Sequence, residues 1–282
     1  MKLQNTIKSE IIFKGVGLHS GKIAKVKVCP APPNFGIAFR RVDIPDSPQI
    51  KTNVNFVIFD DLFRRTTIGL GDIRINTIEH FLAVCTALSI DNLFIEIDTD
   101  EFPFFDGSAQ EILSKFLEAG VKTQDSEKKY LIPAKPVSYK IGEVEISVIP
   151  SNSLILTMWV EYKNSFVGFQ YFSGEITPEF FEKEIAPART FGFVEEIESL
   201  RKAGLIKGGS LENALVFGEQ GLINNIPLRY ENEVVRHKIL DFLGDLSLIG
   251  IPFKGHYTAV KSGHKYHIEF VRELLNSLDK GV

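Results

Sequence analysis

The sequence predicts an α+β protein made of two similar domains that face each other, each a β-sheet layered with α-helices. Two observations favour this fold class. The order strands, helix, strand, helix occurs once in each half of the 282-residue chain, and a polar, charged segment at residues 123–129 separates the halves. Because such segments are typical of domain boundaries, we expect domains at residues 1–123 and 130–282.

The first half begins with strand patterns. Apolar residues recur over residues 7–13, 23–29 and 37–40, and glycine and proline separate these runs. A helix is expected to begin at Asn76, because an apolar stripe with helical spacing follows at Ile78, Phe81, Leu82, Cys85 and Leu88. A strand over residues 93–97 and a second helix over residues 109–119 complete this half.

The second half repeats this order. Strand patterns occupy residues 130–132, 144–149 and 154–160. A helix is predicted over residues 234–249, with an apolar stripe at Val235, Ile239, Phe242, Leu243 and Leu246. A strand over residues 257–260 and a last helix over residues 266–278 follow it. Sequence identity between the halves is negligible, so the recurring order alone predicts two similar domains.

Composition limits the classes of function. The net charge is -4 and no block of Lys and Arg resembles a basic arm, so we expect no nucleic-acid partner. No apolar run reaches the roughly 18 residues of a membrane span, and the first residues lack a signal-peptide core. We therefore expect a cytoplasmic monomer with no stable membrane insertion and at most transient contact with a membrane surface. The only cysteines, Cys29 and Cys85, are expected to be reduced.

One face of the helix predicted over residues 234–249 is the most informative feature. His237 and Asp241 are four residues apart and project from this face, where they can bind one metal ion. Asp245 continues the face by a further turn. Two carboxylates at this spacing repel each other in an isolated helix, so we expect a balancing cation, either a metal or a protonated histidine.

His80 lies at the comparable start of the first half's helix, about 200° around it from Ile78 and so outside the apolar stripe. If the domains face each other, His80, His237 and Asp241 converge between them. Two imidazoles and one carboxylate leave a fourth position open, which is typical of catalytic zinc, and Fe²⁺ suits these ligands nearly as well. Together with the polar clusters at residues 79–80 and 262–264, this set indicates metal-assisted hydrolysis.

Each of these residues also has a plainer interpretation. Glu79 lies three positions after Asn76, so it could equally close a capping box at the helix start. A lone histidine such as His80 is more often a solvated surface residue than a ligand, and a histidine four residues before an aspartate occurs by chance in many helices. Structural roles are expected for three further histidines, His19, His256 and His267.

Phenylalanine is unusually frequent, with 23 residues, several of them near residues 191–193. Core packing is one explanation. A channel for a lipid tail is the other, because glycines at 204, 208 and 209 would let a helix end and a loop border a groove. The glycine-rich run at residues 15–21 is not interpreted as a Rossmann site, since a strand pattern follows it instead of a helix.

Nine short motifs, in order along nearly the whole chain, together resemble the UDP-3-O-acyl-N-acetylglucosamine deacetylase family. They are GVGLHSG at residues 15–21, TIEH at 77–80, DGSA at 106–109, ARTFGF at 188–193, KGGS at 207–210, RYENE at 229–233, VRHK at 235–238, GDL at 244–246 and KSGH at 261–264. The resemblance implies two facing α+β domains with zinc between them. It also implies removal of the N-acetyl group from a UDP-linked, 3-O-acylated glucosamine, the committed step of lipid A synthesis.

The resemblance implies roles for individual residues. It makes His80, His237 and Asp241 the zinc ligands, the same set that the helix faces indicate. Glu79 becomes the general base for the attacking water, and His264 becomes a second acid–base residue.

Five further residues receive roles from the resemblance alone. Asp245 orients and charges the acid–base histidine, and Thr190 hydrogen-bonds the oxyanion of the tetrahedral intermediate. Lys238 is a cation that holds substrate near the metal, Lys261 lies at the UDP end, and Phe191 packs near the substrate. The phenylalanine-rich region then corresponds to a passage for the 3-O-acyl chain.

Three other functions are compatible with parts of this pattern. A metal-dependent deacetylase of another N-acyl sugar would share the metal and acid–base residues and lack the contacts with UDP and the acyl chain. A non-catalytic protein that binds acylated nucleotide sugars would release no acetate. A structural zinc protein would hold no exchangeable water on the metal, and an open fourth position argues against it.

Overall fold

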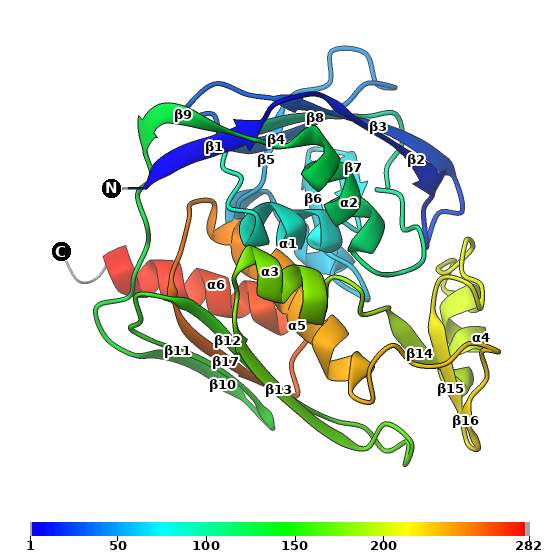
Figure 1. The fold of residues 1–282 in the computed structure, drawn as a ribbon. Helices are drawn as coiled ribbons and strands as arrows, with labels where there is room; N and C mark the ends of the chain where they lie inside the picture. Colours follow the sequence, from blue (N-terminus) through cyan, green and yellow to red (C-terminus); the bar gives the residue numbers. More distant parts are fainter. Residues whose placement is uncertain (1, 280–282) are drawn as a thin grey trace.

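The computed structural model describes residues 2–279, and two five-stranded sheets enclose a layer of helices (Figure 1). The first sheet consists of β2 (Ile11–Val16), β3 (Ile23–Pro30), β4 (Ile37–Arg41), β5 (Ile50–Lys51) and β8 (Leu93–Ile97). The second consists of β10 (Val137–Ile141), β11 (Val144–Ile149), β12 (Leu154–Glu161), β13 (Phe169–Glu175) and β17 (Gly255–Val260).

The two sheets have the same topology. When the strands of each sheet are numbered along the chain, both follow the order 1-2-5-3-4, and the fifth strand runs parallel to the third. In each half one α-helix comes last before the fifth strand and another follows that strand. These are α1 (Glu79–Ala87) and α2 (Gln110–Ala119) in the first half, and α5 (Glu233–Leu246) and α6 (His264–Asp279) in the second. This repeat confirms the predicted class of two similar, facing α+β halves.

The alternation in the strands explains how the core forms. In β3, Ala24, Val26 and Val28 are buried while the residues between them are not, as expected for a sheet with one face against helices. Helices α1 and α5 pack against each other in the centre. Their apolar side chains belong to one continuous cluster that draws on both sheets. The core is therefore shared between the halves.

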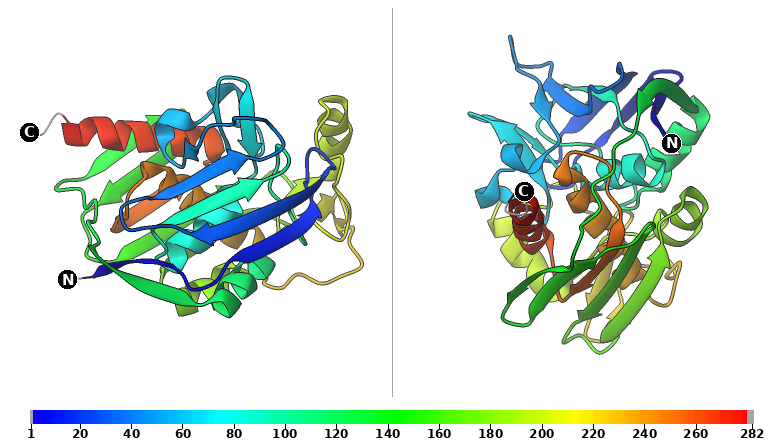
Figure 2. Two further views of the ribbon diagram at one scale, coloured as in Figure 1. Left: turned by 90° about the horizontal axis from the view of Figure 1, so that it is seen from above. Right: turned by 90° about the vertical axis from the view of Figure 1, so that its left-hand side faces the viewer.

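Smaller elements complete the fold. A two-stranded antiparallel sheet pairs β1 (Leu3–Ile7) with β9 (Val121–Glu127), and β6 (Thr67–Leu70) pairs with β7 (Ile73–Asn76). A separate three-stranded sheet with a helix projects from one end of the molecule in both Figure 1 and Figure 2; it comprises β14 (Phe191–Phe193), α4 (Val194–Lys202), β15 (Leu215–Gly218) and β16 (Gly221–Leu222). Short helical turns lie at Val54–Phe56, Phe59–Asp61, Pro178–Phe180 (α3), Phe181–Ile185 and Ser247–Ile249.

Two predicted strands were wrong. The pattern over residues 7–13 is divided, because β1 ends at Ile7 and β2 begins at Ile11, with three exposed polar residues between them. Residues 130–132 form no strand, and their only pairing is an isolated bridge from Leu131 to Phe253. The first error ignores the polar residues that interrupt the run, and the second has another cause, because an apolar run shows burial but does not show whether a partner strand pairs with it.

The predicted start of α1 was also wrong. Asn76 is the last residue of β7, and the helix begins at Glu79, whose preceding residue Ile78 makes no side-chain capping bond. The capping-box interpretation therefore fails. Instead, Oε2 of Glu79 accepts a hydrogen bond from the backbone N–H of Thr66. Thr77, which stands between the strand and the helix, has a left-handed φ of 59°, so the chain turns sharply where the prediction continued the helix.

The segment predicted as a charged connector contains a strand. Residues 123–127 of the predicted connector (123–129) lie in β9, which pairs with β1 at the amino end of the chain. Apart from Val121 its side chains are polar and it forms no apolar alternation, so its sequence pattern does not reveal it. The boundaries of the two domains, at residues 1–123 and 130–282, stay a prediction.

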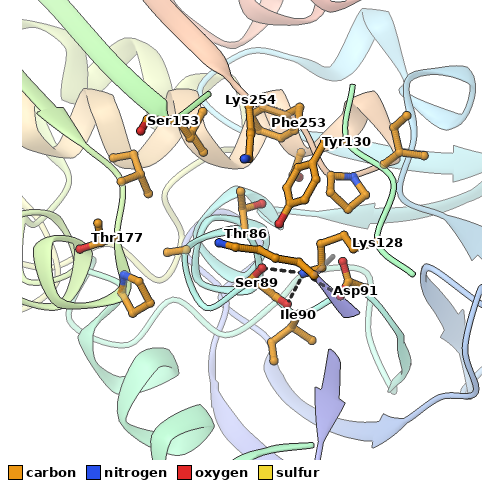
Figure 3. Close-up of a pocket in the computed structure, with 18 of the residues that line it drawn as sticks. Thr86, Ser89, Ile90, Asp91, Lys128, Tyr130, Ser153, Thr177, Phe253 and Lys254 are labelled. Carbon is orange, nitrogen blue, oxygen red and sulfur yellow. Dashed lines mark hydrogen bonds and ion pairs between the residues drawn. The ribbon is translucent and has the colours of Figure 1, made fainter. Parts of the chain in front are cut away.

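A cavity of about 450 Å³ lies at the carboxyl end of α1 (Figure 3). At its edge the buried ammonium group of Lys128 pairs with Asp91 at 2.9 Å and donates to the backbone oxygen and the hydroxyl of Ser89 at 2.9 and 2.6 Å. These bonds tie the segment after β9 to the loop after α1. Within residues 2–279, no helix is long and apolar enough to cross a membrane. Both cysteines are free, as predicted.

Candidate active site

The site begins where α1 meets α5. Gly244 faces the first turn of α1 so closely that an added Cβ atom would lie 2.1 Å from the backbone oxygen of Glu79. Only glycine permits this approach, because the neighbouring atom belongs to a helix backbone and cannot swing aside. The close contact brings the amino end of α1, with Glu79 and His80, beside the polar face of α5.

All three predicted ligands meet at this contact. His80, His237 and Asp241 each offer one ligand atom, and these atoms all lie within 4.8 Å of one another. Nε2 of His80 and Nε2 of His237 are 3.5 and 3.4 Å from Oδ1 of Asp241. All three residues are buried. The first half supplies one ligand and the second half supplies two, so the group bridges the halves.

The surroundings prepare this group for a metal ion. Nδ1 of His237 donates to the backbone oxygen of Ala188 at 3.1 Å, which leaves Nε2 free to act as a ligand. Burial lowers the pKa of His237 to about 4, so its imidazole is neutral at physiological pH. Burial alone would raise the pKa of Asp241, but Lys238 and His237 outweigh it and hold that pKa well below its usual range. Neutral imidazoles and a charged carboxylate are what a divalent ion requires.

Lys238 lies against this group rather than projecting into open space. Its ammonium nitrogen is 2.8 Å from Oδ2 of Asp241, and the residue is buried. Burial by itself would lower the pKa of Lys238, but the carboxylate of Asp241 reverses the shift and raises it. The lysine therefore remains charged and neutralises the second oxygen of the carboxylate.

Glu79 is the acidic group nearest the start of α1. It is 2% exposed, and the N–H of Thr66 contacts its Oε2 at 3.0 Å. Burial raises the pKa of Glu79, which is opposed by the nearby His264 and His80. A carboxylate with a raised pKa binds a proton more readily than an exposed one, which is the property that a general base needs.

His264, the first residue of α6, forms a pair with Asp245. Its Nδ1 lies 2.8 Å from Oδ2 of Asp245, and its Nε2 faces the ligand group, 3.8 Å from Oδ2 of Asp241. Burial would lower the pKa of His264, but Asp245 outweighs burial and raises it to about 9. Burial would likewise raise the pKa of Asp245, and His264 instead lowers it to about 2. At neutral pH the pair is therefore a charged imidazolium next to a carboxylate.

Two residues of this network were missed from the sequence. His267 was predicted to be structural, yet its Nδ1 lies 2.7 Å from Oδ2 of Asp245. Thr66 drew no prediction, although its hydroxyl donates to Oδ1 of Asp245. The spacing of His267, three residues after His264, was a visible signal. Thr66 had none, because only the fold brings it to α5.

Thr190 and Phe191 lie on the other side of the ligand group. The backbone N–H of Thr190 donates to the backbone oxygen of Gly107 at 2.8 Å. The backbone oxygen of Thr190 accepts a hydrogen bond from the N–H of Leu215, also at 2.8 Å. These bonds fix the backbone while the side chain lines the same pocket as His237. The half-buried ring of Phe191 is 6.3 Å from the His237 ring, centroid to centroid.

The pocket over the ligand group has a volume of about 540 Å³. Its base is polar and includes His237, Asp241 and His264. Its walls are largely apolar and lead to α4, with contributions from Leu62, Phe193, Ile197, Leu200, Ile206 and Val216. A polar base and an apolar passage are typical of a site for an amphiphilic small molecule.

Lys261 lies at the edge of this pocket. Its ammonium group forms ion pairs with Glu161 and with Glu143, the latter at 3.4 Å, and its φ is 50°. The other two histidines lie outside the ligand group. The backbone N–H of buried His19 donates to Glu101 at 2.9 Å, and Nε2 of His256 is 2.8 Å from the hydroxyl of Thr157.

Comparison with known proteins gives one consistent result. The family model for LpxC, UDP-3-O-acyl N-acetylglycosamine deacetylase, matches residues 4–276. Proteins named UDP-3-O-acyl-N-acetylglucosamine deacetylase are similar over almost the full chain. The one from Citrifermentans bemidjiense is 41% identical, and the match covers 99% of this chain and 91% of the relative. The one from Trichormus variabilis is 42% identical, and the match covers 96% of this chain and 98% of the relative. The relative from Syntrophus aciditrophicus is 40% identical, and the match covers 98% of this chain and 87% of the relative.

Proposed function

The chain belongs to the UDP-3-O-acyl-N-acetylglucosamine deacetylase family, and from that premise we propose that it removes the N-acetyl group from UDP-3-O-acyl-N-acetylglucosamine in lipid A synthesis. The products are UDP-3-O-acyl-glucosamine and acetate. One observation supports this most strongly: the ligand group His80, His237 and Asp241 lies between the two halves, and Glu79 and His264 adjoin it.

We propose Zn²⁺ as the metal, one ion per chain, with Fe²⁺ as the alternative. The residues fit such an ion, because the donors are two imidazole nitrogens and one carboxylate oxygen, and the hydrogen bond from His237 to Ala188 orients a ligand. Bound there, the ion would supply Lewis acidity toward the amide carbonyl and lower the pKa of water.

Glu79 and His264 then divide the proton transfers. The carboxylate of Glu79, held through one oxygen by Thr66, accepts a proton from the attacking water. The water oxygen bonds to the amide carbon, the C–N bond breaks, and the imidazolium of His264 donates its Nε2 proton to the leaving amine. Asp245 keeps His264 charged for this step, and the hydroxyl of Thr190 donates a hydrogen bond to the developing oxyanion.

The pocket supports the amphiphilic substrate. We propose that the apolar passage toward α4 holds the 3-O-acyl chain, with Phe191 at its inner end. We propose that Lys238 also holds substrate beside the metal; in the structure its ammonium group donates to Asp241. Lys261, at the pocket edge, is proposed to face the UDP end, where substrate phosphates would compete with Glu143 and Glu161 for its charge. A monomeric state and a cytoplasmic location stay predictions.

Three alanine variants test these roles. His237→Ala is expected to lose the metal and all activity, because the two remaining ligands cannot hold the ion tightly. Glu79→Ala and His264→Ala are expected to keep the metal and lower turnover by roughly a hundredfold or more. Metal content by elemental analysis and acetate release by the same samples check both properties.

His256→Ala is the matched control, because this histidine lies on β17 outside the ligand group and bonds Thr157. It is expected to keep both metal and activity. Full activity in Glu79→Ala or His264→Ala would exclude the proposed proton transfers. Acetate release from an N-acetyl sugar without the 3-O-acyl chain, at an equal rate, would instead indicate a deacetylase of another N-acyl sugar.

A further inference from the structure

The carboxylate of Asp245 is held at more points than its pairing with His264 requires. Asp245 is fully buried. Its Oδ2 lies 2.8 Å from Nδ1 of His264 and 2.7 Å from Nδ1 of His267, and its Oδ1 accepts a hydrogen bond from the hydroxyl of Thr66. Both oxygens are therefore anchored, so the carboxylate cannot rotate about its terminal torsion, which is otherwise a soft one.

Thr66 connects the two halves of the site. It is fully buried just before β6 and so belongs to the first half, whereas Asp245 and His264 belong to the second. Its hydroxyl oxygen is also 3.2 Å from Nδ1 of His264, and its backbone N–H donates to Oε2 of Glu79 at 3.0 Å. One threonine thus contacts both Glu79 and the pair that contains His264.

His267 anchors the other oxygen and is itself fixed. A ring nitrogen can approach a carboxylate oxygen this closely only as an N–H donor, so Nδ1 of His267 carries a proton. Its Nε2 is 2.8 Å from the hydroxyl of Ser262, and its ring lies 4.7 Å from that of Phe242. Because Ser262 precedes His264 by two residues, the loop before α6 is bonded to the first turn of that helix.

We propose that Thr66 and His267 are positioning residues, which hold the carboxylate of Asp245 through its two oxygens and thereby fix the direction in which His264 presents Nε2 to the substrate. This inference rests on the proposed function, in which His264 donates the proton. A displacement of about 1 Å at a reacting group can cost roughly a hundredfold in rate. Loss of either anchor should therefore slow turnover without weakening substrate or metal binding.

Two pairs of variants test this role. Thr66→Val removes only the hydroxyl, whereas Thr66→Ser keeps it; His267→Leu removes the donor, whereas the amide of His267→Asn can replace Nδ1–H. We expect Thr66→Val and His267→Leu to lower kcat by roughly 10- to 100-fold, with KM changed less than about threefold and bound metal unchanged. The Ser and Asn variants are expected to remain within about threefold of the unsubstituted protein.

A coupling test separates positioning from a general loss of structure. If Thr66 acts through Asp245, then Thr66→Val should lower kcat by less than about threefold when Asp245→Ala is already present, because that variant has no side-chain oxygen left for the Thr66 hydroxyl to hold. An equal cost in both backgrounds would overturn the proposal. So would full activity of Thr66→Val, an equal loss in Thr66→Ser, or a loss confined to KM or metal content. If His267→Leu does not fold, the comparison of Thr66→Val with Thr66→Ser still tests the proposal.

One readout does not depend on catalysis. The Nδ1 proton of His264, seen in the downfield proton NMR spectrum, is expected to broaden or disappear in Thr66→Val and to persist in Thr66→Ser. Identical spectra of the two variants would overturn the proposal. Failure of the unsubstituted protein to release acetate would count against the proposed function instead, so the two failures are distinguishable.

Discussion

At the scale of single residues, the pair His264 and Asp245 predicts how activity depends on pH. Asp245 raises the pKa of His264 to about 9, above its ordinary value near 6.5. The histidine stays protonated up to that pH, so kcat/KM should fall as the pH rises through about 9. On the acid side, activity should fall as the pH drops through the raised pKa of Glu79.

Asp245→Asn tests the cause of the alkaline limb. The neutral amide no longer favours the imidazolium, so the pKa of His264 should fall and the limb should move to lower pH. The measurement is the pH dependence of kcat/KM for the two proteins under identical conditions. An alkaline limb that does not move would mean that Asp245 does not set the charge of His264.

The residues that the sequence predicted and those that it missed differ in one respect. His237, Asp241 and Asp245 lie on one helix at spacings of four, so helical geometry alone put them on one face. His80 required only the further assumption that the two halves face each other. Thr66 lies 179 positions from its partner Asp245, and no local pattern marks such a contact. The roles assigned to these residues stay predictions.

At the scale of elements, the contact between α1 and α5 predicts the effect of Gly244→Ala. Alanine favours a helix over glycine by about 1 kcal/mol. The added Cβ, however, would lie 2.1 Å from the backbone oxygen of Glu79, and overpacking of this kind typically costs about 1–3 kcal/mol. We expect a net loss in the free energy of unfolding, and weaker metal binding because His80 moves with α1.

Denaturation by urea and a metal titration measure these two quantities. Gly192→Ala is the matched control, since no atom lies within 4 Å of its added Cβ atom, and it should not lower stability. Unchanged stability and metal affinity in Gly244→Ala would show that the two helices are not held at the distance described.

The bounds of an element could be predicted well where its apolar residues follow a clear pattern, and poorly where they do not. The strands at Leu93–Ile97 and Val144–Ile149 have the predicted bounds, because apolar residues alternate there between clear polar flanks. Strand β9 is mostly polar, and its pairing with β1 across the chain decides its conformation, so no local rule identifies it. The same holds for the turn at Thr77, which ends β7 before α1 and was predicted as helix.

At the scale of the whole molecule, the metal is expected to stabilise the fold. Its proposed ligands come from both halves, and an ion that binds only the native state stabilises it by mass action. Chelation should therefore lower the melting temperature, by roughly 5–10 °C, and added Zn²⁺ should restore it. His237→Ala should melt at the lower temperature with or without Zn²⁺. An identical response of this variant and the unsubstituted protein would place the metal elsewhere.

The repeat of the fold was visible in the sequence only as an order of elements. That order predicted two similar halves, and the structure adds that both sheets follow the order 1-2-5-3-4. Strand order depends on pairing between distant segments, which single-sequence patterns do not specify. The shared core of α1 and α5 could not be predicted for the same reason, although it is what brings the two halves of the site together.

The most direct test is acetate release from UDP-3-O-acyl-N-acetylglucosamine by chelator-treated protein, before and after one equivalent of Zn²⁺ per chain is added. A metal-dependent deacetylase predicts no release before addition and restored release after it. Full release from the metal-free protein, or no release although the metal binds, would contradict this function.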